Sequence, residues 1–194
     1  MIEATAYILM GGKSTRFGSE KWKAKLGSHT VLDVVWNACN IFKERKLIGK
    51  KKPTQKNKTF ILDFYNYCAP IVGIHTAIVN SKTNWILILS CDLPLINEEC
   101  LKFIWDSKTK QVDAVVPIVK NRIQPLCSLY NIDILSQLNH SINKQNFSLH
   151  NFLKTINTQF INMDHYEKSF LNMNTQDDLK RVKKIRFNNK LKYF

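Results

Sequence analysis

The sequence predicts an α/β fold, a three-layer α/β/α sandwich around a doubly wound, mostly parallel sheet. Short apolar runs alternate along the chain with segments of helical periodicity, which is the pattern of successive β-α-β units. Ala4–Met10 (ATAYILM) stops abruptly at Gly11, and Trp85–Cys91 (WILILSC) is apolar throughout, as in a central strand covered on both faces. Because ligands of such folds bind beyond the carboxyl ends of the strands, the residues that follow these two runs are the first place to look for a site.

The other elements follow in order along the chain. A helix is expected over Thr30–Phe42, with Thr30 as its N-cap and Asp33 at the third helical position. Strands are expected at Lys46–Gly49 and Thr59–Asp63. The remaining expected helices are Ile71–Val79, Asn97–Trp105, Ile132–Ile142, Ser148–Ile156 and one from Thr175, and the remaining strands are Asp113–Val119, Pro125–Tyr130 and Gln159–Met163.

Length and composition indicate one compact domain over residues 1–194, located in the cytoplasm. The chain has no apolar run of the roughly 18 to 20 residues that span a bilayer. Met1–Met10 lacks the basic start and the cleavage site of a secretion signal. An odd number of scattered cysteines without a CxxC pair favours buried reduced thiols; these are Cys39, Cys68, Cys91, Cys100 and Cys127.

The net charge of +14 comes from two segments. Residues 43–58 carry eight Lys or Arg and one acid, and residues 180–194 carry seven Lys or Arg and no acid. The favoured interpretation is a solvated surface on a loop and a tail, which makes nucleic acid an unlikely partner. A basic nucleic-acid-binding protein is the alternative from a different functional class.

The segment Gly11–Lys21 (GGKSTRFGSEK) has the composition of a polyphosphate-binding loop. Its glycines let backbone N–H groups approach phosphate oxygens, and its three cations would stabilise their charge. It is not a Walker A motif, because Tyr7 stands where that motif requires glycine, and its spacing does not match GxGxxG. The alternative is a tight strand-to-helix connection with solvated cations.

Asp92 stands in Cys91–Pro94 (CDLP), directly after the predicted central strand. Magnesium is held by one or two carboxylates together with phosphate oxygens and waters, so one well-placed aspartate is sufficient protein ligation. Asp92 is therefore the candidate metal ligand. The alternative is an aspartate that caps a turn before Leu-Pro.

Together these motifs, in their order along the chain, resemble those of the molybdenum cofactor guanylyltransferase (MobA-like) family. The family has a Rossmann-like nucleotidyltransferase fold. The segments that carry the resemblance are Leu9–Lys21, Pro70–Gly73, Cys91–Pro94, Gln124–Leu126 and Asn172–Thr175.

The resemblance implies transfer of GMP from GTP to the phosphate of molybdenum-bearing molybdopterin, with Mg²⁺ as cofactor and release of pyrophosphate. Molybdoenzymes or cofactor-carrier proteins would be the protein partners. In this scheme Arg16, Lys21 and Asp92 are the catalytic residues, and Asp92 binds the metal. The implied nucleotide-binding residues are Leu9, Met10, Gly11, Gly12, Ser14, Lys21, Asp63 and Asp92, and the implied acceptor-binding residues are Gln124, Asn172 and Asn174.

Some positions leave alternatives open. Lys50–Lys52 follows the strand end at Gly49 where the family carries an asparagine, so the residue that would assist guanine recognition is unassigned. Asp63, the implied guanine acceptor, could instead be a turn residue, and Asn172 and Asn174 could support a helix start at Thr175. A cytidylyltransferase or a sugar-phosphate nucleotidyltransferase on the same scaffold is the alternative enzyme.

Overall fold

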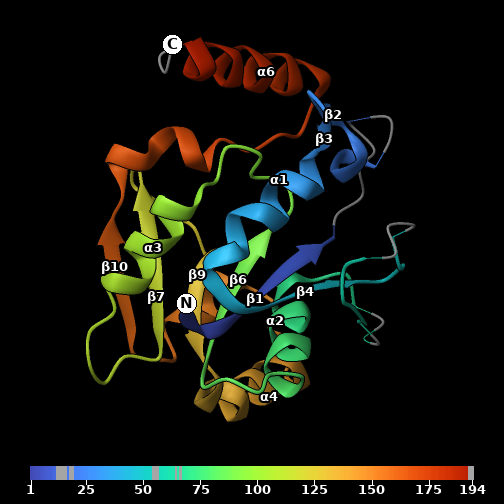
Figure 1. Ribbon diagram of the computed structural model, residues 1–194. Coiled ribbons are helices and arrows are strands. Elements are labelled where there is room, and N and C mark those ends of the chain that lie inside the picture. The colour runs from blue at the N-terminus through green and yellow to red at the C-terminus, as the bar shows by residue number, and fades with distance from the viewer. Residues whose placement is uncertain (12–16, 18–19, 54–56, 64, 66, 192–194) are drawn as a thin grey trace.

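The computed structural model describes residues 1–11, 17, 20–53, 57–63, 65 and 67–191 and is built on one large twisted sheet (Figure 1). In the described residues this sheet has eight strands, in the order β10-β7-β9-β6-β1-β4-β5, with β8 paired to β7. The strands are β1 (Ile2–Met10), β4 (Phe42–Gly49), β5 (Phe60–Leu62), β6 (Trp85–Ser90), β7 (Ala114–Val119), β8 (Arg122–Ile123), β9 (Cys127–Asn131) and β10 (Thr158–Asn162).

The sheet is mostly parallel, as predicted. β1 lies between β4 and β6 and is parallel to both, β4 is parallel to β5, and β7 is parallel to β10. β9 runs antiparallel between β6 and β7, and β8 is antiparallel to β7. The carboxyl ends of β1, β4, β5 and β6 therefore lie along the same edge of the sheet.

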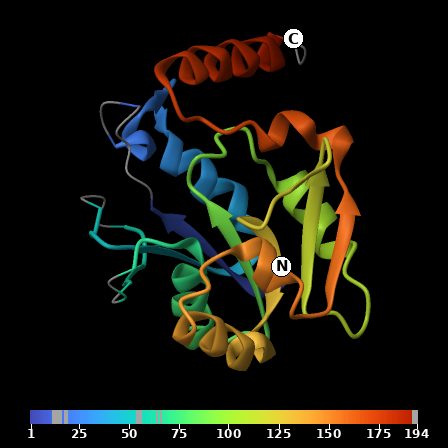
Figure 2. The ribbon, with the colours of Figure 1, turned by 180° about the vertical axis from the view of Figure 1, so that it is seen from behind.

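Helices cover both faces of the sheet, which confirms the three-layer sandwich (Figures 1 and 2). The helices α1 (Val31–Ala38) and α3 (Glu98–Asp106) pack on one face, and α2 (Pro70–Val79), α4 (Leu135–Asn143) and α5 (Leu149–Leu153) pack on the other. The strands supply both layers because their side chains alternate: Leu87 and Leu89 of β6 enter the first core, and Ile86 and Ile88 enter the second.

The last helix, α6 (Gln176–Leu191), lies across the edge of the sheet toward which the arrowheads of the parallel strands point (Figures 1 and 2). Its Leu179 and Val182 are buried in the core that also contains α1 and α3. A basic C-terminal helix was expected here, and the packing of these two side chains explains how so polar a helix is held.

The first helix is shorter than the sequence predicts. Thr30 is its N-cap and forms a capping box with Asp33, as expected, but α1 ends at Ala38 and β4 already begins at Phe42. Phe42 is buried and pairs with β1 at Ile2, so pairing with the sheet overrides the helical periodicity there. The predicted strand at Pro125–Tyr130 likewise starts later, at Cys127, because Cys127 N bonds to Gln124 O (3.0 Å) and closes a turn.

Two further features differ from the expectation. The two-stranded sheet of β2 (Lys25–Leu26) and β3 (His29–Thr30), whose connection includes Gly27 at φ +69°, was not predicted. All five cysteines are free, but Cys68 is exposed, so the prediction of burial is wrong for it. Cys68 lies in the connection between β5 and α2 and not in an element of the core.

Among the described helices, none is long and apolar enough to cross a membrane.

Candidate nucleotide-binding site

The site predicted from the sequence lies at the carboxyl edge shared by β1, β4, β5 and β6. Cys91 N donates to Leu9 O (3.3 Å), so the end of β6 is bonded to the end of β1. On the other side of β1, Gly49 ends β4 and its carbonyl accepts from Asp63 N (2.9 Å). A Cβ at Gly49 would lie 2.9 Å from Met10 O, so only glycine permits this close approach of the two strand ends.

The predicted nucleotide loop begins at Gly11 and is described in part. Gly12, Ser14 and Arg16 lie outside the described residues. Phe17 is buried at 3 % exposure in the core, and Lys21 opens a short 3₁₀-helix, Lys21–Lys23. The Nζ of Lys21 donates to Oδ1 of Asn174 at 2.6 Å, although the two residues are 153 positions apart.

The segment around Asn174 brings the predicted donor-side and acceptor-side residues together. Met173 is fully buried, and its N–H donates to the carbonyl of Asp92 at 2.9 Å. The side-chain amide of Gln176 donates to Phe17 O at 3.0 Å. The metal candidate Asp92, Lys21 and the segment that contains Asn172 and Asn174 therefore belong to one connected region.

Asp92 is half-buried immediately beyond β6. No cluster of three or more His, Cys, Asp or Glu that could hold a metal occurs among the described residues. A divalent ion at Asp92 would therefore need further oxygen ligands that no such cluster supplies. This donor set fits Mg²⁺, which combines one carboxylate with phosphate oxygens and waters.

The neighbouring thiol of Cys91 is chemically inert. Burial, and after it the charge of Asp92, raise the pKa of Cys91 to about 12, although Lys21 acts in the opposite direction. A thiol that stays protonated at neutral pH is neither a nucleophile nor a metal ligand. The opposing effects of Asp92 and Lys21 on one thiol also indicate that both charges lie near the end of β6.

Asp63, the expected guanine acceptor, is 9 % exposed and already carries several hydrogen bonds. Its Oδ1 accepts from Tyr65 N and from Thr76 Oγ1, each at 3.2 Å, and its Oδ2 pairs with Lys50 Nζ at 2.9 Å. A carboxylate has about four acceptor positions, so little capacity remains for two N–H groups of a base.

Lys50 follows the end of β4, where the sequence leaves the residue that would assist guanine recognition unassigned. Besides Asp63 Oδ2, its ammonium donates to the carbonyls of Asp63 (3.3 Å) and Tyr65. Lys50 thus fixes the backbone that follows β5. Sequence reasoning noted the lysine run but missed this function, because the run gives no sign of which lysine has a partner.

Gln124 lies in the turn between β8 and β9. Its N–H donates to Pro117 O (2.9 Å), and its carbonyl accepts from Ser128 Oγ (2.6 Å). In the same turn, Leu126 O accepts from Ser90 N at 2.7 Å. The turn is therefore attached to the end of β6, two residues before Asp92.

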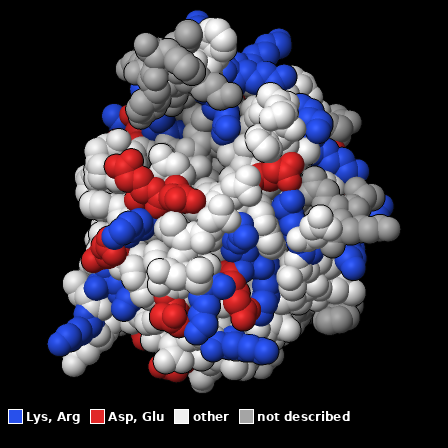
Figure 3. All heavy atoms as spheres, viewed as in Figure 1, with Lys and Arg blue, Asp and Glu red and all other residues white. Residues whose placement is uncertain are grey.

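The basic segment 43–58 is only in part a loop, because residues 42–49 form β4. Four of its eight cations form ion pairs, one with an acid of the segment itself and three with acids from elsewhere in the chain. The pairs are Lys43–Glu3 (2.7 Å), Lys46–Glu44 (2.8 Å), Lys50–Asp63 (2.9 Å) and Lys58–Asp33 (2.7 Å). Acidic and basic side chains accordingly alternate over the face shown in Figure 3.

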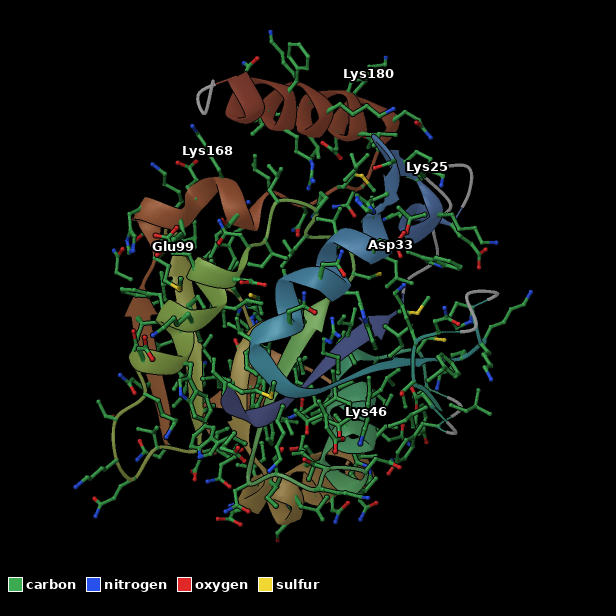
Figure 4. The ribbon with its side chains drawn as sticks, viewed as in Figure 1. Lys25, Asp33, Lys46, Glu99, Lys168 and Lys180 are labelled. Carbon is green, nitrogen blue, oxygen red and sulfur yellow. The ribbon has the colours of Figure 1, made fainter. Side chains whose placement is uncertain are left out.

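Cations also occur on α6, where Lys180 points away from the body of the protein (Figure 4). Lys180, Lys183 and Lys184 are exposed and share one side of the helix, since they are spaced three and four residues apart. Lys180 pairs with Asp177 at 2.9 Å, and both side chains are largely exposed.

Known proteins resemble this chain over most of its length. The family described as "MobA-like NTP transferase domain" matches residues 6–159. A protein of Flavobacterium johnsoniae is 31 % identical over 90 % of this chain and 94 % of its own length, and one of Aquifex aeolicus is 29 % identical over 92 % and 89 %. Both carry the name "Probable molybdenum cofactor guanylyltransferase".

A solved structure shares the fold. The molybdopterin-guanine dinucleotide biosynthesis protein A of Archaeoglobus fulgidus superimposes with a TM-score of 0.82 and 22 % identity, covering 95 % of this chain and 99 % of that protein. The family match covers most of the sequence, and the strand edge joins a loop that begins with glycine, a lysine and an aspartate. The chain therefore belongs to the MobA-like NTP transferase family and is a nucleotidyltransferase.

Proposed function

We propose that this nucleotidyltransferase transfers GMP from GTP to the terminal phosphate of molybdenum-bearing molybdopterin, forming molybdopterin guanine dinucleotide and releasing pyrophosphate. The observation that carries the proposal is the hydrogen-bonded connection of Lys21 through Asn174 and Met173 to Asp92, at the strand edge where Gly11 also follows β1. The names of the two relatives supply the substrates, because the geometry by itself fits any nucleoside triphosphate.

The reaction needs positioning and charge stabilisation more than proton transfer. An oxygen of the pterin phosphate forms a bond to the α-phosphorus of GTP, the bond between the α-phosphorus and the bridging oxygen breaks, and pyrophosphate leaves. A phosphate monoester is already anionic near neutral pH, so no strong general base is required. Lys21 would offset negative charge on the reacting and leaving phosphates, a role we also assign to Arg16.

Asp92 would hold Mg²⁺. When bound there, the ion would supply positive charge that stabilises the negative charge of the reacting phosphates. Leu9, Met10 and Gly11, with Gly12 and Ser14, would contact the nucleotide through the first loop. Gln124 and Asn172 would face the acceptor, since the turn of Gln124 and the segment of Asn172 are both bonded to the chain around Asp92.

Base recognition is proposed at the ends of β4 and β5. Asp63 would accept an N–H of guanine at its remaining acceptor position, while Lys50 keeps the carboxylate and the following backbone in place. A cytosine base presents a different arrangement of donors and acceptors at this edge. We therefore expect GTP to be preferred to CTP.

Pyrophosphate release tests the proposal. The protein is incubated with Mg²⁺, one nucleoside triphosphate and molybdenum-bearing molybdopterin, and each of the four triphosphates is used in turn. Release that requires both GTP and the pterin supports the proposal. Release with CTP would indicate the cytidylyltransferase alternative, and release with a sugar phosphate as acceptor would overturn the choice of acceptor.

The proposed enzyme would act in the cytoplasm, where its substrates and the molybdoenzymes or carrier proteins that take up its product would be available. A nucleic-acid-binding role has less support, because four of the eight cations of residues 43–58 are held in ion pairs with acids. A strongly salt-dependent affinity for DNA or RNA that is unchanged in Asp92→Asn would favour that alternative.

A further inference from the structure

The segment 172–178 contacts two separate parts of the proposed site through three hydrogen bonds. Its middle residue Asn174 accepts a hydrogen bond from Lys21 Nζ, Met173 bonds to the carbonyl of Asp92, and Gln176 bonds to the carbonyl of Phe17. These contacts reach the loop that follows β1 and the strand end that follows β6. The segment also lies beyond residues 6–159, which the family description matches.

Asp178 builds the turn that presents Asn174. Its Oδ2 accepts from the N–H groups of Asn174 and Thr175, both at 2.8 Å, and its own N–H donates to Thr175 Oγ1 at 3.1 Å. Burial raises the pKa of Asp178, but the hydrogen bonds from Asn174 and Thr175 outweigh this effect and lower it below its ordinary value. The carboxylate therefore stays charged at neutral pH, and the turn does not depend on the side chain of Asn174.

We propose that Asn174 is a positioning residue that aims the ammonium of Lys21 at the triphosphate, and that Asp178 in turn fixes Asn174. The inference rests on the proposed function of Lys21. It assigns Asn174 to the nucleotide side of the reaction, in place of the acceptor contact that its sequence motif suggests. Asn172, which is exposed, keeps the acceptor role.

The chemistry of an amide suits this task. An ammonium has three N–H donors, and Asn174 uses one of them, which leaves two for phosphate oxygens. Because the amide oxygen is neutral, it orients Lys21 without cancelling its charge. A carboxylate at the same position would form an ion pair with Lys21 and weaken its interaction with the phosphates.

A double-mutant cycle tests the inference. Asn174→Ala, Lys21→Met and the double variant are compared with the wild type for kcat, for the KM of GTP and of the pterin substrate, and for binding of GTP with Mg²⁺ by calorimetry. Asn174→Ala alone is expected to lower kcat/KM for GTP about 10- to 100-fold, the effect of a misplaced charge in a transition state. In the Lys21→Met background the same change is expected to have an effect below about twofold, because the group it positions is already gone.

The outcomes separate positioning from the alternatives. If Asn174→Ala lowers activity equally in both backgrounds, or mainly raises the KM of the pterin, Asn174 contacts the acceptor and the inference is wrong. A purely structural role would instead lower the melting temperature of Asn174→Ala. We expect that temperature to be unchanged, since Asp178 bonds to the backbone of this turn and not to the amide.

Asp177 and Asp178 provide a matched pair of substitutions. Asp178→Ala should weaken GTP turnover and should lose most of its effect in the Lys21→Met background, whereas Asp177→Ala should leave turnover as in the wild type. Asp177 is exposed and pairs only with Lys180 among the described residues. Equal effects of the two substitutions would overturn the role of Asp178.

Failure of this inference is distinguishable from failure of the proposed function. A wild-type protein that releases no pyrophosphate from GTP and the pterin contradicts the function, whatever the variants do. A wild type that is active, combined with additive effects of Asn174→Ala and Lys21→Met, contradicts only the positioning role.

Discussion

Asp92 is the side chain on which the proposed chemistry depends most directly. It is half-buried beyond the end of β6 and outside both hydrophobic cores. Asp92→Asn removes the charge that would hold Mg²⁺ but preserves the shape, so we expect kcat to fall by at least about 100-fold, as when a main electrostatic contribution is lost. Pyrophosphate release measures this loss. A melting temperature equal to that of the wild type shows that the fold is intact, and wild-type turnover by the variant would contradict the site.

Lys50 permits a second prediction for a single residue. Lys50→Met removes the partner of Asp63 and both bonds to the backbone that follows β5, and leaves a buried carboxylate without its cation. Because the lysine itself is partly exposed, we expect a loss of about 1 to 2 kcal/mol in the free energy of unfolding, less than for a fully buried pair. Urea titration measures the loss.

Lys51→Met is the matched control for Lys50→Met, since Lys51 is exposed and adjacent in the chain. Its stability should equal that of the wild type within about 0.5 kcal/mol, the usual range for surface substitutions. The preference for GTP over CTP should decrease in Lys50→Met and stay unchanged in Lys51→Met. An unchanged preference in both variants would show that Lys50 does not support base recognition.

At the scale of secondary-structure elements, the start of α1 links three segments through Asp33. The carboxylate of Asp33, which is labelled in Figure 4, bonds to Thr30 in the capping box and pairs with Lys58 Nζ at 2.7 Å. It therefore joins the helix to the segment before β5. Burial raises the pKa of Asp33, but the hydrogen bonds from Lys58 and Thr30 outweigh it and lower the pKa from 3.8 to about 2.

The depressed pKa of Asp33 makes its contribution to stability depend on pH. A carboxylate with a lower pKa in the folded state stabilises the protein above pH 3.8, and this stabilisation is lost as the pH falls toward 2. Asp33→Asn should therefore cost about 1 to 2 kcal/mol at pH 7 and at pH 5, and roughly half of that at pH 3. Urea titrations at these three pH values measure the difference, and a cost that does not change with pH would contradict the role of the charge.

Elements were easier to predict than their directions and their partners. The burial of β1 and β6 on both faces is visible in the sequence as two continuous apolar runs, and so is the capping box at Thr30. The direction of β9 is not, because an apolar strand has the same period whether it runs parallel or antiparallel. The bond between Lys21 and Asn174 was also beyond sequence reasoning, since it joins positions 153 residues apart that no local pattern relates.

At the scale of the whole molecule, the two basic segments differ in how many of their cations form ion pairs with acids. Four of the eight cations of residues 43–58 are paired with acids, whereas Lys183 and Lys184 are exposed and have no ion-pair partner among the described residues. In the control variant Lys43→Gln/Lys102→Gln, both lysines are paired with acids, Lys43 with Glu3 and Lys102 with Asp106. The double variant Lys183→Gln/Lys184→Gln should thus elute from a heparin column at lower salt than this control, although both lose two charges. Pyrophosphate release should be unchanged in both, because none of these lysines belongs to the proposed site. Equal elution would show that only net charge matters.

The contacts made by the segment 172–178 have a consequence for the order in which the parts of the proposed site form during synthesis. Lys21 leaves the ribosome long before its partner Asn174, and at about 5 to 20 residues per second the delay is on the order of ten seconds. During that interval the nascent chain can already form β1, β4 and β6 while the lysine lacks its anchor. Full catalytic competence would then be acquired only after Asn174 has been made, although the central strands are complete well before it.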